Sequence, residues 1–157
     1  MKTCPDCNGD GVVDIITTPG LGNVTNRIRV LAFDALSGSI LQNYVVAKSG
    51  SNAAQIGITA GDLDGDGRAE TLLNFTRNGR SELLKFSNGA SASSAVVNGT
   101  AIQVAAKDLD NDGIADLLFA GSAGQLPRIS IKDGSSGLTL LNALILSESQ
   151  RKGLVIA

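Results

Sequence analysis

A nine-residue pattern rich in acidic side chains occurs three times in this chain and limits its possible folds more than any other feature. We name these segments loop 1 (DCNGDGVVD, residues 6–14), loop 2 (DLDGDGRAE, residues 62–70) and loop 3 (DLDNDGIAD, residues 108–116). Oxygen-bearing side chains stand at positions 1, 3, 5 and 9 of each loop, and glycine stands at position 6. Because 11 of the 15 acidic residues lie at these positions, the acids belong to the loops rather than to the surface in general.

The spacing within each loop favours a calcium site. Side chains at alternate positions of a curled loop point to one centre, and glycine at position 6 permits the sharp turn. Without a cation, carboxylates this close together would repel one another or take up protons. Oxygen-only ligands suit Ca²⁺ better than Zn²⁺. The predicted ligands are four side chains and the position 7 carbonyl of each loop: Asp6, Asn8, Asp10, Val12 and Asp14; Asp62, Asp64, Asp66, Arg68 and Glu70; Asp108, Asp110, Asp112, Ile114 and Asp116.

An EF-hand is excluded, because its closing glutamate at position 12 is replaced by Thr17, Leu73 and Phe119. The flanking segments are short β-prone runs bounded by turn residues, such as IGITAG before loop 2 and ETLLNF after it, which predicts strands on both sides. An acidic turn without metal is the alternative interpretation. Loop 1 carries Asn8 where the others carry an acid, so we expect it to bind calcium most weakly.

The loops recur at a regular spacing along the chain. They begin at residues 6, 62 and 108, intervals of 56 and 46 residues, and a period near this length indicates a solenoid, array or propeller. Four β-prone runs per unit of about 50 residues are typical of a propeller blade. We therefore predict an all-β fold: a single propeller segment over residues 1–157, with four-stranded antiparallel blades at about 1–50, 54–98 and 100–147.

On the D-x-D-x-D-G-x-x-D loops and the strands around them, the chain resembles the FG-GAP/VCBS repeats of integrin-α-type β-propellers. The resemblance implies that each loop joins the first and second strands of a blade and binds Ca²⁺, at three sites in this chain. The Phe-Gly and Gly-Ala-Pro signatures that give the repeat its name are absent, so the bacterial VCBS-like branch is the closer match.

The two ends of the chain carry complementary patterns. Loop 1 begins almost at the N-terminus with no predicted strand before it, whereas residues 153–157 (GLVIA) match the strand expected before loops 2 and 3. Three blades are fewer than the four to eight of known propellers, so we predict that this strand completes the first blade of another chain. Such a homo-oligomer would be a six-bladed dimer or a head-to-tail fibre. A fragment of a longer propeller with exposed strand edges is the alternative.

Cys4 and Cys7 overlap loop 1 in C-x-x-C spacing, which raises the alternative of a zinc site. Zinc would need two further ligands, and the chain has no other cysteine and no histidine. A thioredoxin-like redox pair would lie at the start of a helix, and no helix is predicted here. A disulfide in an oxidising compartment and a pair of free thiols both remain open.

The amino-acid composition argues against several classes of function. The absence of histidine removes the commonest general base, and the acids outside the loops (Asp34, Glu82, Asp133 and Glu148) are not paired in the sequence. We therefore predict no enzymatic activity; a fragment of a polysaccharide-active propeller enzyme is the alternative. A net charge of −2 and 3% aromatic residues argue against nucleic-acid binding. No apolar run approaches the roughly 20 residues of a membrane span, and no signal peptide is visible.

The predicted role is an extracellular or cell-surface calcium-binding module for adhesion, recognition or self-assembly, with a glycan or a protein as its possible ligand. Five basic residues are expected to be solvated on the outer faces of strands or in turns: Arg27, Arg29, Arg77, Arg80 and Lys85. Asp34 and Asp133 are expected in hairpin turns, where aspartate hydrogen-bonds to nearby backbone.

Overall fold

The computed structural model describes residues 2–18, 27–47, 54–77, 80–87, 93–97, 102–121 and 128–144. These residues contain twelve β-strands and no helix, so the predicted all-β class is confirmed. It follows that none of the described segments is a long apolar helix of the kind that crosses a membrane.

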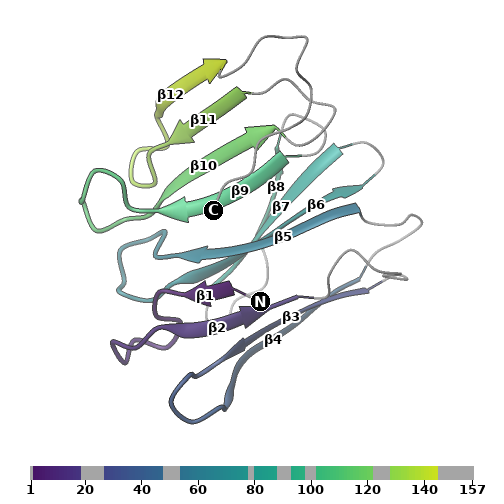
Figure 1. Ribbon diagram of the computed structural model, residues 1–157, viewed down its shortest axis with the longest axis vertical. Helices are drawn as coiled ribbons and strands as arrows, with labels where there is room; N and C mark the ends of the chain where they lie inside the picture. Colours follow the sequence, from purple (N-terminus) through teal and green to yellow (C-terminus); the bar gives the residue numbers. More distant parts are fainter. Residues whose placement is uncertain are drawn as a thin grey trace.

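The strands form three antiparallel sheets of four strands, each in chain order, which confirms the predicted four-stranded blades. Sheet A contains β1 (Lys2–Cys4), β2 (Asp14–Thr17), β3 (Arg27–Phe33) and β4 (Ile40–Ala47). Sheet B contains β5 (Ala54–Gly61), β6 (Glu70–Arg77), β7 (Arg80–Phe86) and β8 (Ser93–Val97). Sheet C contains β9 (Ile102–Lys107), β10 (Asp116–Gly121), β11 (Arg128–Lys132) and β12 (Thr139–Leu144). Sheet B lies between the other two (Figure 1).

Strand β3 illustrates how the sequence determines a blade. In RIRVLAF, Ile28, Val30 and Ala32 are fully buried, while Arg27 and Arg29 between them are exposed. Successive side chains of a strand point to opposite faces, so this alternation gives sheet A one apolar face. That face packs against sheet B.

Sheet B is covered on both faces, because neighbouring residues of β6 belong to different cores. Leu73 and Phe75 pack in the core shared with sheet A, which includes Ile28 and Val30. Leu72 packs instead with Val104 and partly buried residues of sheet C. Burying one such side chain stabilises the fold by about 1.5–3 kcal/mol. The three apolar residues of β6 therefore connect the middle blade to both of its neighbours.

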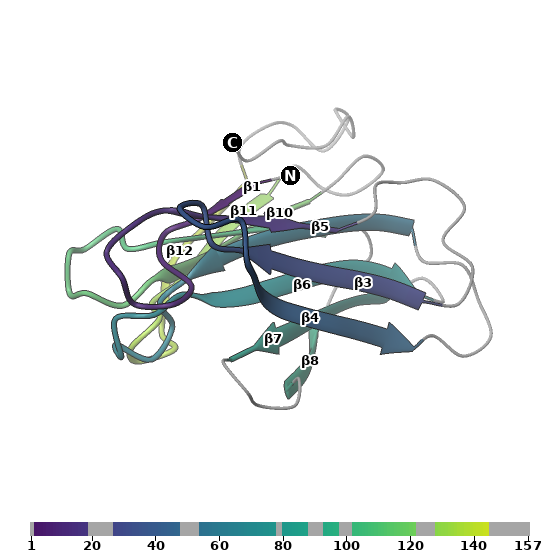
Figure 2. The same cartoon turned by 90° about the horizontal axis from the view of Figure 1, so that it is seen from below.

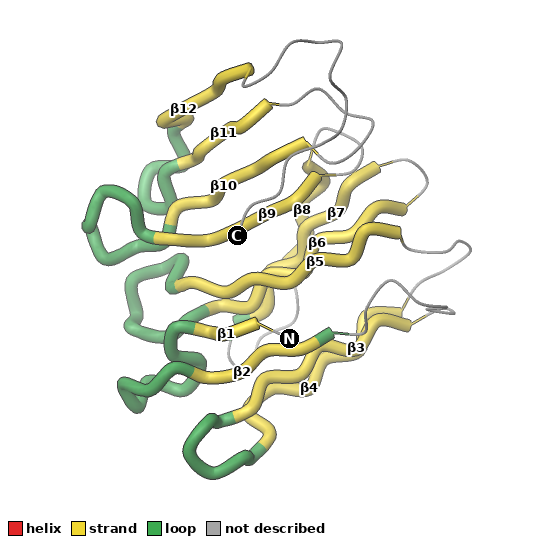
Figure 3. Tube along the Cα trace, viewed as in Figure 1, coloured by secondary structure: helices red, strands yellow, loops and turns green. Residues whose placement is uncertain are grey.

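The loops and turns that carry most of the acids lie along one edge of the stack. Loops 1, 2 and 3 join β1 to β2, β5 to β6 and β9 to β10, as the resemblance implied. The hairpin turns at residues 34–39 and 133–138 lie at the same edge (Figures 2 and 3). Figure 3 shows this edge in green, opposite the far ends of the strands.

The start of the first blade differs from its prediction. Strand β1 precedes loop 1 and pairs with β2 in the register Lys2 to Ile16, Thr3 to Ile15 and Cys4 to Asp14. The expectation that no strand precedes loop 1 is therefore wrong. The sequence conceals β1 because it has only three residues and no apolar alternation. Sheet A thus has a first strand of its own; the strand predicted at residues 153–157 lies outside the described residues.

Candidate metal centres

The three loops share one backbone conformation. At position 6, Gly11, Gly67 and Gly113 have φ angles of 83°, 81° and 89°, in the left-handed region that favours glycine. Position 4 also has a positive φ in every loop, including 63° at Asn111. Asparagine tolerates this region better than most residues, so loop 3 follows the same path as the two loops with glycine at this position.

The aspartate at position 1 organises each loop through its two carboxylate oxygens. One oxygen accepts the backbone N–H of position 4, and the other accepts the N–H of position 6. The two distances are 2.6 and 2.7 Å at Asp6, 2.7 and 2.8 Å at Asp62, and 2.7 and 3.0 Å at Asp108. The loop therefore curls around this carboxylate, which is the geometry that brings alternate side chains together.

Position 5 is bonded to position 7 in the same way in all three loops. A carboxylate oxygen of Asp10, Asp66 and Asp112 accepts the N–H of position 7 at 2.8 Å in each case. This bond fixes the N–H of position 7, the residue whose carbonyl is a predicted ligand. Ligation by the carbonyls of Val12, Arg68 and Ile114 stays a prediction.

The acid at position 9 is buried and acts as an anchor. One oxygen accepts the N–H of position 2, at 2.8 Å for Asp14, 2.8 Å for Glu70 and 3.0 Å for Asp116. In the flanking blades the second oxygen reaches the hairpin turn of the same sheet. Asp14 accepts the N–H of Ala35 at 3.2 Å, and Asp116 accepts that of Gly134 at 3.0 Å. These carboxylates therefore link the loop to the β3–β4 and β11–β12 turns.

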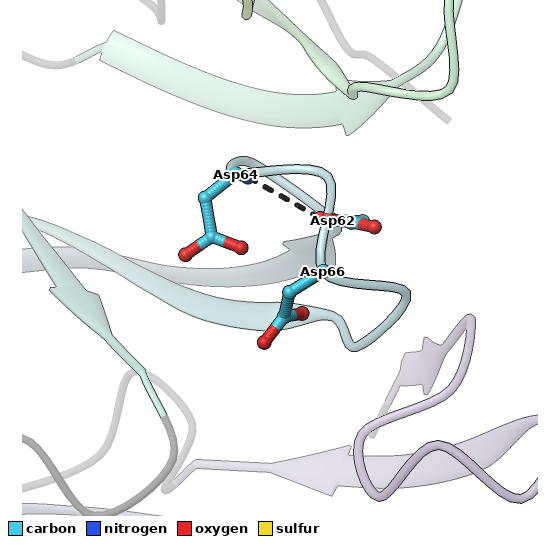
Figure 4. A group of neighbouring side chains, drawn as sticks. All are labelled: Asp62, Asp64 and Asp66. Carbon is cyan, nitrogen blue, oxygen red and sulfur yellow. Dashed lines mark hydrogen bonds between the residues drawn. The ribbon is translucent and has the colours of Figure 1, made fainter.

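The acids converge in two of the loops. Carboxylate oxygens of Asp62, Asp64 and Asp66 all lie within 4.8 Å of one another, as do those of Asp108, Asp110 and Asp116. Figure 4 shows the first group, with the N–H of Asp64 donated to Asp62. Such a group could hold a metal ion.

The convergence does not include every predicted ligand. Glu70 and Asp112 lie outside the two groups of three carboxylates. Among the described residues, the three acids of loop 1 form no such group. There the amide of Asn8 donates to Asp10 at 3.0 Å instead.

Desolvation, hydrogen bonds and neighbouring charge change the pKa of two predicted ligands, Asp110 and Asp6. Partial desolvation, and then repulsion from Asp112, Asp116 and Asp133, raises the pKa of Asp110 above its ordinary value. Burial opposes ionisation of Asp6 as well, but hydrogen bonds from four backbone N–H groups outweigh it and lower the pKa. A carboxylate with raised pKa is one that a cation would stabilise in its charged form.

Lys85 contacts candidate ligands, a contact that the sequence prediction missed. Its ammonium lies 3.5 Å from Glu70 Oε2 and 3.7 Å from Asp64 Oδ2, so it is paired with loop 2 rather than solvated on an outer face. No sequence pattern marks this contact, because it depends on the pairing of Lys85 with Leu72 across β6 and β7. By contrast, Arg27, Arg29 and Arg80 are exposed as predicted, and the side chain of Arg77 is not described.

Consecutive loops are hydrogen-bonded to each other. The N–H of Ala69, at position 8 of loop 2, donates to the carbonyl of Asp6 at 2.6 Å. The N–H of Ala115, at position 8 of loop 3, donates to the carbonyl of Asp62, also at 2.6 Å. Position 8 of one loop therefore docks on position 1 of the loop before it, and these hydrogen bonds link the loops of neighbouring blades.

The two cysteines form a disulfide across the entry to loop 1. Cys4 ends β1 and Cys7 is position 2 of the loop, where its N–H donates to Asp14 at 2.8 Å. Both sulfurs are buried. The zinc alternative therefore has no thiolate ligands here, and of the two options left open by the sequence the structure has the disulfide.

The two remaining aspartates lie in hairpin turns, as predicted. Asp34 accepts the N–H of Leu36, and Asp133 accepts the N–H groups of Ser135 and Ser136, each at 2.8 or 2.9 Å. A hydrogen bond from Ser37 lowers the pKa of Asp34, and hydrogen bonds led by the Ser136 N–H lower that of Asp133. Local backbone bonding of this kind is typical of aspartate in turns.

The sequence of the first blade and the start of the second matches a known repeat. A family model described as an FG-GAP-like repeat covers residues 6–73, from the first residue of loop 1 to a point in β6 just beyond loop 2. No curated protein matches the chain. FG-GAP repeats form the blades of β-propellers, which agrees with the three four-stranded sheets. The resemblance is thereby confirmed over this stretch: residues 6–73 carry an FG-GAP-like repeat, and the pattern of its two loops occurs once more in the third blade, at loop 3.

Proposed function

We propose that this chain is a calcium-binding β-propeller segment in which Ca²⁺ is structural. The observation that carries the proposal is the shared loop conformation, in which position 1 curls the backbone and the acids of loops 2 and 3 converge within 4.8 Å. The donor set fits the ion, because every predicted ligand is an oxygen and Ca²⁺ prefers six to eight oxygen ligands.

The role of the ion would be to offset the repulsion among the carboxylates of a loop. Each loop joins the first two strands of a blade, and loops 2 and 3 each hydrogen-bond to the loop before them. A filled site would therefore stabilise its own blade and the contact with the next. The buried acids at position 9 would hold the loop on the sheet while the exposed acids at positions 3 and 5 complete the site.

An extracellular location is part of the proposal. Calcium-binding modules outside the cell commonly have dissociation constants of about 10⁻⁴–10⁻³ M, which open and partly exposed loops of this kind would match. The Cys4–Cys7 disulfide supports an oxidising compartment. We propose a binding role rather than catalysis, with a glycan or a protein as ligand.

Calcium binding can be tested by equilibrium dialysis of the full chain with ⁴⁵Ca²⁺. We expect three bound ions per chain, and two in each of the variants Asp62→Asn and Asp108→Asn, which remove the carboxylate that curls one loop. Asp34→Asn is the matched control, since Asp34 lies in a turn outside the loops, and it should keep three. Binding of no calcium at millimolar concentration would contradict the proposal.

Self-assembly is a second candidate function, favoured by the outer face of sheet C and by the exposed Val13 of loop 1. In sheet C, Leu118, Ile131 and Leu141 are paired across the strands on the face turned away from sheet B, and Leu141 is exposed. Val13, at position 8 of loop 1, is 51% exposed, whereas Ala69 and Ala115 are 4% and 5% exposed where they dock on the preceding loop. A second copy could thus extend the series by placing its Val13 against Asp108.

Two routes of assembly can be separated by light scattering in calcium. Leu141→Lys should lower the mass if the outer faces dock. Deletion of residues 153–157 should lower it if the terminal strand is exchanged, as the sequence predicts. A monomeric wild-type chain at high concentration would contradict both routes.

A further inference from the structure

Lys85 supplies a positive charge inside the calcium site of the middle blade. The side chain leaves β7 on the face that carries Leu72, and its ammonium reaches Asp64 and Glu70, at positions 3 and 9 of loop 2. Two of the four acidic ligands are thus within 3.7 Å of a cation that belongs to the protein.

The pair is not an ordinary surface ion pair. The side chain of Lys85 is 28% exposed and that of Glu70 only 4% exposed. Exposed pairs contribute little because water screens them, whereas a buried carboxylate depends on its partner. Burial raises the pKa of Glu70, while a backbone hydrogen bond from Leu63 and the charge of Lys85 counteract the rise.

The equivalent places in the other two blades are uncharged. Leu72 is at position 11 counted from the start of its loop, and it pairs with Lys85. The residue at the same position is Ile16 in sheet A, which pairs with Ala32, and Leu118 in sheet C, which pairs with Ile131. Lys85 is therefore a departure of one blade from the repeat rather than a feature of the repeat.

The charge of each site changes accordingly. Loops 2 and 3 carry four carboxylates each, and loop 1 carries three because of Asn8. Lys85 offsets one of the four carboxylate charges of loop 2, and the side chain of Arg68, at position 7 of loop 2, lies over Gly9 of loop 1. A neighbouring cation repels a divalent ion and also satisfies the carboxylates in its absence.

We propose that Lys85 is a resident counter-ion of loop 2, which keeps this loop folded without calcium and lowers its calcium affinity. The inference rests on the proposed function of the loops as calcium sites. The middle blade, whose core joins both neighbours, thereby keeps its shape when calcium falls. Among the described residues no lysine forms an ion pair with the four carboxylates of loop 3, although Lys107 pairs with Asp116 across β9 and β10, so loop 3 is the loop that responds first.

The experiment is a Ca²⁺ titration of the full chain, followed by the backbone amide signals of Gly11, Gly67 and Gly113, which report the three loops separately. In Lys85→Met we expect the midpoint of Gly67 to move to a calcium concentration at least about tenfold lower. The melting temperature in chelator should fall at the same time. A lysine that served packing alone would lower stability without tightening calcium binding.

Matched variants show whether the effect of Lys85→Met comes from the loss of the positive charge at this position. Arg80→Met removes a positive charge from the exposed start of the same strand and should leave the Gly67 midpoint unchanged. Lys85→Arg keeps the charge and should stay within about threefold of wild type. If Lys85→Met does not fold, Lys85→Gln removes the charge with a polar side chain and should tighten loop 2 in the same way.

The possible failures are distinguishable. An unchanged or weaker Gly67 midpoint in the charge-removing variants, with Gly11 and Gly113 responding normally, would overturn the role of Lys85 alone. No response of any of the three glycines to millimolar Ca²⁺ would overturn the proposed function and this inference together.

Discussion

Loops 2 and 3 carry the same four-carboxylate pattern but have different surroundings. In loop 3 the buried acid at position 9 is held by the N–H of Gly134, and Asp133 in the same turn contributes to the raised pKa of Asp110. In loop 2 the acid at position 9 faces the ammonium of Lys85. The repeated motif thus sets the predicted ligands, while the neighbouring strand and turn set the charge around them.

Loop 1 differs from both, because it has three carboxylates instead of four and is constrained by a disulfide. It has Asn8 instead of an acid, and the disulfide closes its entry. The side chain of Arg68 from loop 2 also lies over its Gly9. These differences predict three sites of unequal affinity, with loop 3 the tightest.

The largest expected effect comes from removing calcium altogether. A site that is saturated at 100 times its dissociation constant stabilises the fold by about 2.7 kcal/mol, so the melting temperature should fall clearly in chelator. Circular dichroism with and without excess Ca²⁺ measures this. Equal melting temperatures in both conditions would show that calcium does not stabilise the fold, and calcium binding could then not distinguish the loops.

The next largest effect should be a difference in stability, measured in chelator, between variants of the two position 9 acids Asp116 and Glu70. Asp116→Asn should cost about 1.5–3 kcal/mol, because a buried carboxylate that accepts two backbone N–H groups is replaced by an amide with one acceptor. Glu70→Gln should cost less, within about 1 kcal/mol of wild type, because the amide oxygen can still accept the N–H of Leu63 and the loss of the ion pair with Lys85 is offset by removal of a buried charge. Urea unfolding of both variants gives the difference, and equal losses would mean that the two anchors are equivalent.

A smaller effect should appear in the pH dependence of the calcium-free protein. Burial raises the pKa of Glu70 above its ordinary value of 4.5, so the folded state binds more protons than the unfolded state in that window. Stability contributed by this group therefore falls as pH rises through the window. The stability of Glu70→Gln relative to wild type should increase from pH 4 to pH 7 in chelator. A constant difference across this range would show that Glu70 ionises normally.

The smallest effect should come from reducing the disulfide. Reduction frees the entry of loop 1, so the Gly11 midpoint should shift to higher calcium while Gly113 stays in place. Cys4→Ser with Cys7→Ser gives the same comparison without a reductant. An equal shift at both glycines would indicate a global rather than a local constraint.

The features of the candidate sites that depend on residues close together in the chain could be predicted from the sequence. The spacing of Asp62, Asp64 and Asp66 with Gly67 specifies a curled loop, and the apolar runs around it specify strands. The contacts that distinguish the loops are not local. The pairing of β6 with β7 brings Lys85 to loop 2, and the stacking of blades brings Ala115 to Asp62.

Strand β1 shows a second limit of sequence reasoning. Its three residues have no strand pattern of their own, and they are held by pairing with β2 and by the disulfide at Cys4. Tertiary context therefore decides the first strand of the first blade, whereas β6 is apparent from its own apolar residues.

The most direct test of the account is the order in which the loops of the wild-type chain fill with calcium. Amide spectra recorded during a Ca²⁺ titration give separate midpoints for Gly11, Gly67 and Gly113. We expect all three signals to move, with Gly113 at the lowest calcium concentration and Gly11 and Gly67 at higher ones. Signals that stay fixed to millimolar calcium, or a Gly67 midpoint equal to or below that of Gly113, would contradict it.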